Sequence, residues 1–149
     1  MKRFAYTVAQ IVWGLPQTVT GAVMYLAYRD RPHFSYHGAI VTVWPYASSL
    51  SLGLFVFLSH DPRVPAGHRK TPLETYAGEV LVHEYGHTIQ SLILGPLYLP
   101  LVGLPSLLWA HVPACKRLRA RRDMSYYRFV TERNANKLGE AVCHEPAPR

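Results

Sequence analysis

Cysteine and acidic residues are both scarce in this sequence of 149 residues. The two cysteines, Cys115 and Cys143, have neither the number nor the spacing of a disulfide framework or a cysteine-based metal site. They favour a reduced environment, such as the cytoplasmic side of a membrane. Only nine aspartates and glutamates are present, so a site that needs a carboxylate has few residues to draw on.

The hydrophobic fraction of 49% and a mean hydropathy near zero exclude two classes of chain. A polytopic membrane protein would be more apolar, and an intrinsically disordered chain would be far less so. The length corresponds to a single domain, residues 1–149. The formal charge of +7 favours an anionic partner, which could be nucleic acid, anionic lipid or an acidic protein.

The N-terminal region, residues 1–31, contains an apolar segment at 4–28 that carries no charged residue and is flanked by basic ones. Its length would cross a bilayer, but Gln10, Pro16 and Gln17 interrupt it, and Pro16 would kink a helix near its middle. Two interpretations are open: the segment spans or lies on a membrane, or it packs on the rest of the domain as a buried or interfacial helix. No signal-peptide cleavage site follows, so we expect the segment to be retained.

Two segments, 37–44 and 49–58, have the composition of β-strands. In the second segment, aliphatic residues occupy every other position from 50 to 58, as expected for a strand with one buried face. We therefore expect a β-hairpin whose turn lies at 45–48. The following loop, 60–70, is polar and contains two histidines, His60 and His68, which we expect at the surface.

A helix start signal follows this loop. Thr71 suits the N-cap, Pro72 suits the first helical position, and Glu74 completes a capping box. Gly95 suits the left-handed position that ends a helix, and the proline after it prevents continuation. These signals predict a helix over 72–94.

Within this predicted helix, residues 83–87 read His-Glu-Tyr-Gly-His, an H-E-x-x-H motif. His83 and His87 would lie one turn apart on the same face of a helix, so both imidazoles can reach one ion. Glu84 would lie about 100° round the helix, where it can serve a metal-bound water without being a ligand. The motif is typical of half of the site of a zinc-dependent hydrolase.

A second apolar stretch, 97–112, is broken by prolines and a glycine and is short for a membrane span. We expect a re-entrant or interfacial segment. Five cations follow directly: Lys116, Arg117, Arg119, Arg121 and Arg122. This order matches the positive-inside pattern next to an anionic membrane. A solvated linker is the alternative, and nucleic-acid binding is least favoured because aromatic interleaving and a known motif are lacking.

The last predicted element is a helix at 124–142, which is indicated by the helical spacing of Tyr127, Val130, Thr131, Asn134, Ala135 and Leu138. The remaining residues, 143–149, have the character of a frayed tail.

Two histidines do not complete a catalytic zinc site, so a third protein ligand is required. Glu132 is the best candidate because its helix can cross the first one, whereas Glu79 lies on the same straight helix as the histidines. Taken alone, Glu132 would be a surface residue beside Arg128 or Arg133. Asn136 lies one turn further on the same face, where it can hydrogen-bond a ligand histidine. The remaining carboxylates belong to the helix cap, predicted loops or the tail: Asp30, Asp61, Glu74, Asp123, Glu140 and Glu145.

H-E-Y-G-H at 83–87, followed by Glu-x-x-Ala-Asn at 132–136, resembles the zincin metallopeptidases whose third ligand is a glutamate. The pattern is similar to that of prenyl-protein endopeptidase and the bacterial heat-shock membrane protease, in which the second motif is Glu-x-x-Ala-Asp. Asn136 replaces that aspartate, which weakens the expected support of a ligand histidine. Residues 83–99 also resemble a string found in a group of small bacterial proteins, which implies no particular activity.

The resemblance implies a zinc ion held by His83, His87 and Glu132, with Glu84 as general base. The fold it implies is α+β: a small zincin-like core at 37–142, made of a β-hairpin and about four helices, with the motif on the central helix. The outer strand of the hairpin could hold an extended peptide. No transition-state stabiliser follows from the spacing; the candidates are His111, Tyr126 and Tyr127, for which packing or an interface is the alternative role. Gly53 and Gly86 would permit close backbone approach.

The function expected from these features is a zinc-dependent, metallopeptidase-like hydrolase that acts on a peptide or protein. We expect it to associate with an anionic membrane, at the bacterial inner membrane or its cytoplasmic side, with a cytoplasmic location as the alternative. Two other functions stay open: a non-catalytic zincin-like binding module, and a membrane-associated structural protein whose histidine motif is accidental.

Overall fold

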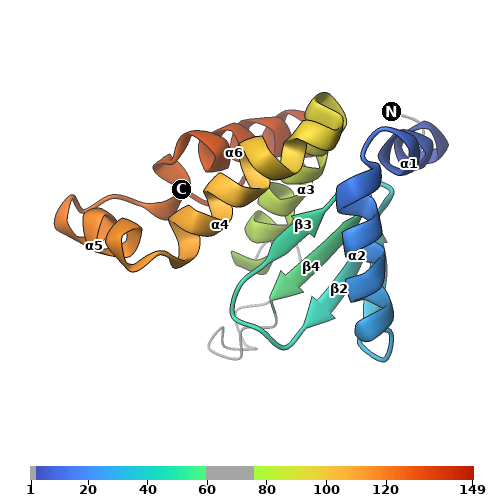
Figure 1. Ribbon diagram of the computed structural model, residues 1–149, viewed down its shortest axis with the longest axis horizontal. Helices are drawn as coiled ribbons and strands as arrows, with labels where there is room; N and C mark the ends of the chain where they lie inside the picture. The colour runs from blue at the N-terminus through green and yellow to red at the C-terminus, as the bar shows by residue number, and fades with distance from the viewer. Residues whose placement is uncertain (1–2, 60–75) are drawn as a thin grey trace.

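The computed structural model describes residues 3–59 and 76–149. Two of the sequence predictions lie outside the described residues: the helix start at 71–74, and the loop at 60–70 with His60 and His68. Within the described ranges the chain combines α-helices with one small sheet (Figure 1). The predicted α+β class is therefore confirmed.

The described ranges contain six α-helices where about four were predicted, because the N-terminal apolar segment divides into two helices and residues 113–121 form a further one. The helices are α1 (Arg3–Val12), α2 (Leu15–Ala27), α3 (Tyr76–Leu94), α4 (Leu104–His111), α5 (Pro113–Arg121) and α6 (Val130–Cys143). Short turns of other helix types lie between them: η2 (Gly95–Leu97), η3 (Leu99–Gly103) and η4 (Tyr126–Arg128). The strands are β1 (His33–Tyr36), β2 (Ala39–Trp44), β3 (Leu50–Leu52) and β4 (Phe55–Ser59).

The sheet has the order β1-β2-β4-β3, and its pairing differs from the predicted hairpin. β1 and β2 form one antiparallel hairpin, and β3 and β4 form a second one. β2 and β4 lie side by side but run parallel. The prediction that 37–44 and 49–58 pair as one hairpin is therefore wrong.

The physical reason lies at Gly53, which divides the predicted second strand. Gly53 has φ +61° and forms, with Leu54, a two-residue turn between β3 and β4, and glycine at this first position suits a tight hairpin turn. Thr18 of α2 packs against Gly53 so closely that a Cβ there would lie 2.1 Å from the Thr18 hydroxyl oxygen. The chain reverses here because no other residue accepts both this φ and this contact.

Helices cover both faces of the sheet. Ser51 of β3 faces α3, where its hydroxyl meets Glu84, whereas Phe55 of β4 faces Gly21 and Tyr25 of α2. In Figure 1, α2 passes in front of the sheet and α3 lies behind it. All four residues from Phe55 to Leu58 are buried for this reason, so the alternation in the sequence does not mark a solvent-exposed face.

The N-terminal apolar segment forms two helices rather than one. The break comes at Trp13 and Gly14, and Pro16 lies in the first turn of α2, where a proline costs no helical hydrogen bond. The second apolar stretch becomes η2, η3 and α4. Among the described residues, none of the helices has the length and apolarity that crossing a membrane requires.

The predicted C-terminal end of the motif helix is confirmed. α3 ends at Leu94, and Gly95 follows with φ +55°, the left-handed conformation that stops a helix.

α6 was predicted as a helix at 124–142, but it begins only at Val130. Buried positions are Glu132, Ala135, Asn136, Gly139 and Cys143, whereas Val130 is 61% exposed. Of the residues whose spacing predicted this helix, only Ala135 is buried, because the inward side of α6 is largely polar or small, and apolar periodicity does not register such residues.

The prediction of a frayed tail at 143–149 is wrong, because these residues contact α6. Ala147 is buried, and its backbone N–H donates to the Glu140 carboxylate. The carbonyl of Pro148 accepts a hydrogen bond from the Asn136 amide, and Arg149 forms an ion pair with Glu140. Since these contacts use backbone groups and a terminal side chain, periodicity could not reveal them.

Candidate metal centre

α3 and α6 cross at two glycines, and this crossing positions the candidate site. A Cβ at Gly86 would lie 1.9 Å from the carbonyl oxygen of Ala135, and one at Gly139 would lie 2.2 Å from that of Val82. The two backbones therefore touch directly. Gly86 and Gly53 do permit close approach, as predicted, but the approaching groups are α6 and Thr18 of this protein.

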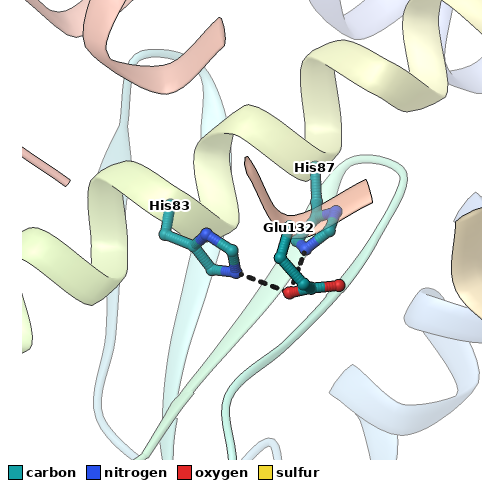
Figure 2. A group of neighbouring side chains, drawn as sticks. All are labelled: His83, His87 and Glu132. Carbon is teal, nitrogen blue, oxygen red and sulfur yellow. Dashed lines mark ion pairs between the residues drawn. The ribbon is translucent and has the colours of Figure 1, made fainter. Parts of the chain in front are cut away.

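At this crossing, the predicted ligands come together. One ligand atom from each of His83, His87 and Glu132 lies within 4.8 Å of the others. Oε2 of Glu132 is 3.2 Å from Nε2 of His83 and 3.4 Å from Nε2 of His87 (Figure 2). The histidines project from one face of α3, and Glu132 reaches them from the first turn of α6.

The three side chains are buried, and their donor atoms suit a metal ion. Glu132 is fully buried, and its Oε2 faces the two imidazole nitrogens. A buried carboxylate is costly unless it is paired, and a cation between this oxygen and the two imidazole nitrogens would satisfy all three atoms. The group formed by His83, His87 and Glu132 could therefore hold a metal ion.

Both histidines are oriented by amides on the side away from Glu132. Nδ1 of His83 lies 2.5 Å from the amide oxygen of Asn136, and Nδ1 of His87 lies 2.7 Å from that of Gln90. An amide oxygen only accepts, so each Nδ1 carries a proton, and Nε2 is the nitrogen that faces Glu132 and is available to a metal ion. Asn136 thus occupies the predicted position.

Gln90 was missed by sequence reasoning. Its own amide nitrogen donates to the Thr131 carbonyl and to Asn134, which ties α3 to the start of α6. The signal was present, because Gln90 lies three residues after His87 on the same helical face. A glutamine on a helix is usually solvated, however, so its spacing alone was not distinctive.

Burial and neighbouring charges shift the pKa values of Glu132 and His87 in opposite directions. Burial raises the pKa of Glu132, but contacts with His83 and His87 outweigh burial and hold the pKa well below its ordinary value. At His87, burial lowers the pKa, and Glu132 outweighs this effect and raises it. The cluster without metal therefore favours a protonated imidazole beside a carboxylate, and metal binding would displace that proton.

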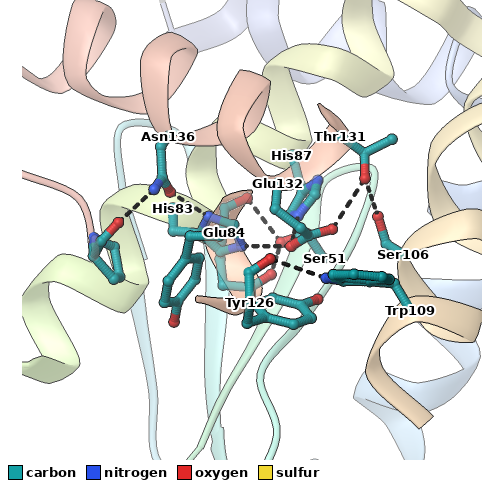
Figure 3. A network of polar contacts seen from close by, with 12 residues as sticks. Ser51, His83, Glu84, His87, Ser106, Trp109, Tyr126, Thr131, Glu132 and Asn136 are labelled. Carbon is teal, nitrogen blue, oxygen red and sulfur yellow. Dashed lines mark hydrogen bonds and ion pairs between the residues drawn. The ribbon is translucent and has the colours of Figure 1, made fainter. Parts of the chain in front are cut away.

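Glu84 lies next to the cluster and is held by the sheet. The Ser51 hydroxyl lies 2.6 Å from Oε2 of Glu84 and 2.8 Å from the Glu84 backbone oxygen (Figure 3). Glu84 is 5% exposed and does not belong to the group of ligand atoms. Ser51 comes from β3, which is far away in the sequence, and sequence analysis did not single it out.

Aromatic side chains form a wall of the site. Tyr127 packs edge-on against His83 with 5.0 Å between the ring centroids. Tyr126 lies beside Glu132 (Figure 3); burial raises the pKa of its hydroxyl, and the negative charge of Glu132 raises it further. The Tyr126 hydroxyl therefore stays protonated and can donate a hydrogen bond. Trp109 of α4 supports this wall by donating to the Tyr126 carbonyl, 3.0 Å away.

The other candidate residues in the described ranges lie away from the ligand group. His111 is exposed at the end of α4, and Glu79 is half-buried near the start of α3. Glu140 is engaged by Arg149 and by the backbone of Ala147. Asp30 and Asp123 are exposed.

A positively charged cavity adjoins the His83 side of the cluster. Asn136 and Tyr127, which both contact His83, also line this cavity of about 400 Å³. Four cations are among its remaining lining residues: Arg128, Arg133, Lys137 and Arg149. Such a group of cations attracts anionic groups to this side of the molecule.

Comparisons with protein-family models, with curated proteins and with solved structures found no match for this chain. Any assignment of function therefore rests on the geometry of the site.

Proposed function

We propose that this protein is a zinc-dependent hydrolase of the metallopeptidase type. The proposal rests on one observation: the ligand atoms of His83, His87 and Glu132 converge within 4.8 Å in a buried site, with Glu84 next to them. The predicted zincin-like fold and its glutamate-ligand arrangement belong to this proposal.

The donor set favours zinc over other ions. Two imidazoles and one carboxylate are a common set for catalytic zinc, and the hard ions Mg²⁺ and Ca²⁺ prefer sites built from oxygen. Three protein ligands leave a fourth position open for water. A zinc ion held by these three ligands would lower the pKa of the water at the fourth position and would polarise a substrate carbonyl.

Glu84 would act as the general base. It lies next to His83 in the motif, and the Ser51 hydroxyl, 2.6 Å from Oε2, holds its carboxylate in one orientation. A carboxylate held in this way can accept a proton from an attacking water and then deliver it to the leaving amine. Tyr126 could donate a hydrogen bond from its hydroxyl to the oxyanion that develops on the substrate carbonyl.

A polypeptide substrate is part of the proposal. β3 is an edge strand of the sheet and carries Ser51 beside Glu84. The hydroxyl of Tyr98, however, already donates to the Ser51 carbonyl over 3.3 Å. A peptide strand that pairs with β3 would have to replace this hydrogen bond, so the Tyr98 side chain would have to move before the peptide binds.

The deciding experiment compares zinc content and peptide cleavage in the same preparations. We expect one zinc per chain in the wild type and in Glu84→Gln, and loss of zinc in His83→Ala and Glu132→Ala. Cleavage of an unfolded protein substrate should fall by at least 10²-fold in Glu84→Gln, the lower end of what a general base contributes. Glu79→Gln, on the same helix, is the matched control and should cleave like the wild type.

Two outcomes would contradict the proposal. If Glu132→Ala binds zinc as tightly as the wild type, the third ligand is wrong. If the zinc-loaded wild type cleaves no peptide bond, or Glu84→Gln cleaves as fast as the wild type, the site is not a hydrolase of this kind. Zinc binding without any cleavage would favour the non-catalytic module.

A further inference from the structure

α1 and α2 bury polar side chains against the rest of the protein and expose large apolar side chains on their outward faces. Their inward side chains include two glutamines: Gln10 donates to the Thr88 carbonyl, and Gln17 donates to the Ser91 hydroxyl and the Gly95 carbonyl at the end of α3. Both glutamines are fully buried. The outward side chains are large and apolar, between 41% and 81% exposed: Phe4, Val8, Ile11, Val12, Leu15, Val19, Val23 and Leu26.

A second row of exposed aliphatic residues runs from the end of α3 into α4. From Leu97 onward, a spacing of three or four residues places the row on one side of a continuous helical path, whereas Ile93 lies before the left-handed Gly95. The members are Ile93, Leu97, Leu101, Leu104 and Leu108, all between 47% and 62% exposed. The sequence from Tyr85 to Cys115 contains no charged residue, so charge does not interrupt this row.

The two regions meet at Trp13, which lies between α1 and α2. Its indole packs against Gly95 so closely that a Cβ there would lie 2.3 Å from a ring carbon, yet Trp13 is still 53% exposed. In Figure 1, α4 passes in front of α3, and α2 passes in front of the sheet. We call the outward residues of α1 and α2, Trp13 and the row from Ile93 to Leu108 the apolar surface.

Cations border the apolar surface. α5 follows α4 after one residue, has no buried side chain and carries four cations without an acidic residue, and a fifth cation, Arg122, follows it directly. Arg3 precedes the α1 row, and Arg29 follows α2. Apolar helices with cations at their ends match the two zones of an anionic bilayer, hydrocarbon and headgroup.

We propose that the apolar surface docks into one leaflet of an anionic lipid bilayer. A large exposed apolar patch requires a covering partner, and the polar contacts of Gln10 and Gln17 leave the outward faces free to meet lipid. α1 and α2 have 10 and 13 residues, or roughly 15 and 20 Å, against about 30 Å for the hydrocarbon core. They therefore lie in the membrane surface. This inference is independent of the proposed hydrolase activity.

Vesicle flotation of the full chain tests the proposal. We expect the protein to float with vesicles of phosphatidylcholine and phosphatidylglycerol, and less with phosphatidylcholine alone. Val23→Glu and Leu104→Glu, each at an exposed position, should lower vesicle binding at least tenfold with unchanged circular dichroism. Val142→Glu, an exposed position of α6 outside the apolar surface, is the matched control. Arg117→Glu and Arg121→Glu should each weaken binding to anionic vesicles by roughly fivefold or more.

Two results would overturn the proposal. The first is binding to anionic vesicles that Val23→Glu and Leu104→Glu leave unchanged, or no binding by the wild type. The second is a wild-type dimer in light scattering that Val23→Glu dissociates, with no vesicle binding, because a second copy of the chain would then cover the apolar surface.

Discussion

Two amide side chains next to His83 and His87 orient these histidines in the candidate metal centre. Asn136 and Gln90 hold the outer nitrogens of His83 and His87 at 2.5 and 2.7 Å. Their amide oxygens select the imidazole tautomer that leaves Nε2 free. An amide carries no charge, so it raises the basicity of the imidazole less than a carboxylate would. The site thus orients its ligands through geometry more than through charge.

Removing these amides should weaken metal binding without removing a ligand. We expect Asn136→Ala and Gln90→Ala each to lower zinc affinity by about 10- to 100-fold, measured by competition with a chelating dye. Asn136→Asp is the informative partner variant and should bind zinc at least as tightly as the wild type. Wild-type affinity in Gln90→Ala would show that the His87 contact does not orient the ligand.

At the scale of elements, the crossing of α3 and α6 matters most. Gly86 against Ala135 and Gly139 against Val82 let the two helix backbones touch, which brings Glu132 within reach of both histidines. Helices usually pack 8–10 Å apart, depending on the side chains between them. At the wider end of that range, a carboxylate on α6 would not reach both imidazoles.

A methyl group at Gly86 should therefore separate the helices. We expect Gly86→Ala to lower the free energy of unfolding by about 3 kcal/mol, measured by urea denaturation, and to weaken zinc binding. Gly103→Ala is the control, because a Cβ there would meet its nearest neighbour at an ordinary 3.5 Å. Equal stability of the two variants would contradict the direct backbone contact.

At the scale of the whole molecule, the buried cluster links stability to pH and metal. The raised pKa of His87 stabilises the metal-free fold below the ordinary histidine value of 6.5, and this contribution is lost as pH rises through the folded-state pKa. The lowered pKa of Glu132 stabilises the fold above the ordinary value of 4.5, and this is lost as pH falls through the folded-state pKa. Zinc needs deprotonated ligands, so its contribution grows as pH rises.

The melting temperature should thus depend on pH in opposite directions with and without metal. With a chelator, we expect the cluster's contribution to be greatest between about pH 4.5 and 6.5. With zinc at 100 times its Kd, the gain at neutral pH should be about 2.7 kcal/mol, or roughly 5–10 °C. Calorimetry from pH 5 to 8 checks this. Zinc stabilisation that does not increase with pH would indicate binding elsewhere.

Local signals predicted some elements well and failed where distant segments meet. The end of α3 at Gly95 was correct because a left-handed glycine stops a helix by itself. Glu132 lies beside both histidines in the structure, and the sequence pointed to it because carboxylates are scarce and a catalytic zinc site requires a third protein ligand. The pairing of β2 with β4 was wrong because it depends on the turn at Gly53, and Thr18 from another helix packs against that turn.

The sequence by itself determined the H-E-x-x-H motif, the helix that carries it and the apolar character of the N-terminal segment, because each follows from residues that are close neighbours along the chain. Only the tertiary structure decided which groups pack against these side chains. Ser51 meets Glu84, and Gln90 meets His87 and the start of α6, while the glutamines of α1 and α2 turn inward and their aliphatic side chains turn outward. Hydrophobicity tells which side chains avoid water, and only packing shows whether protein covers them.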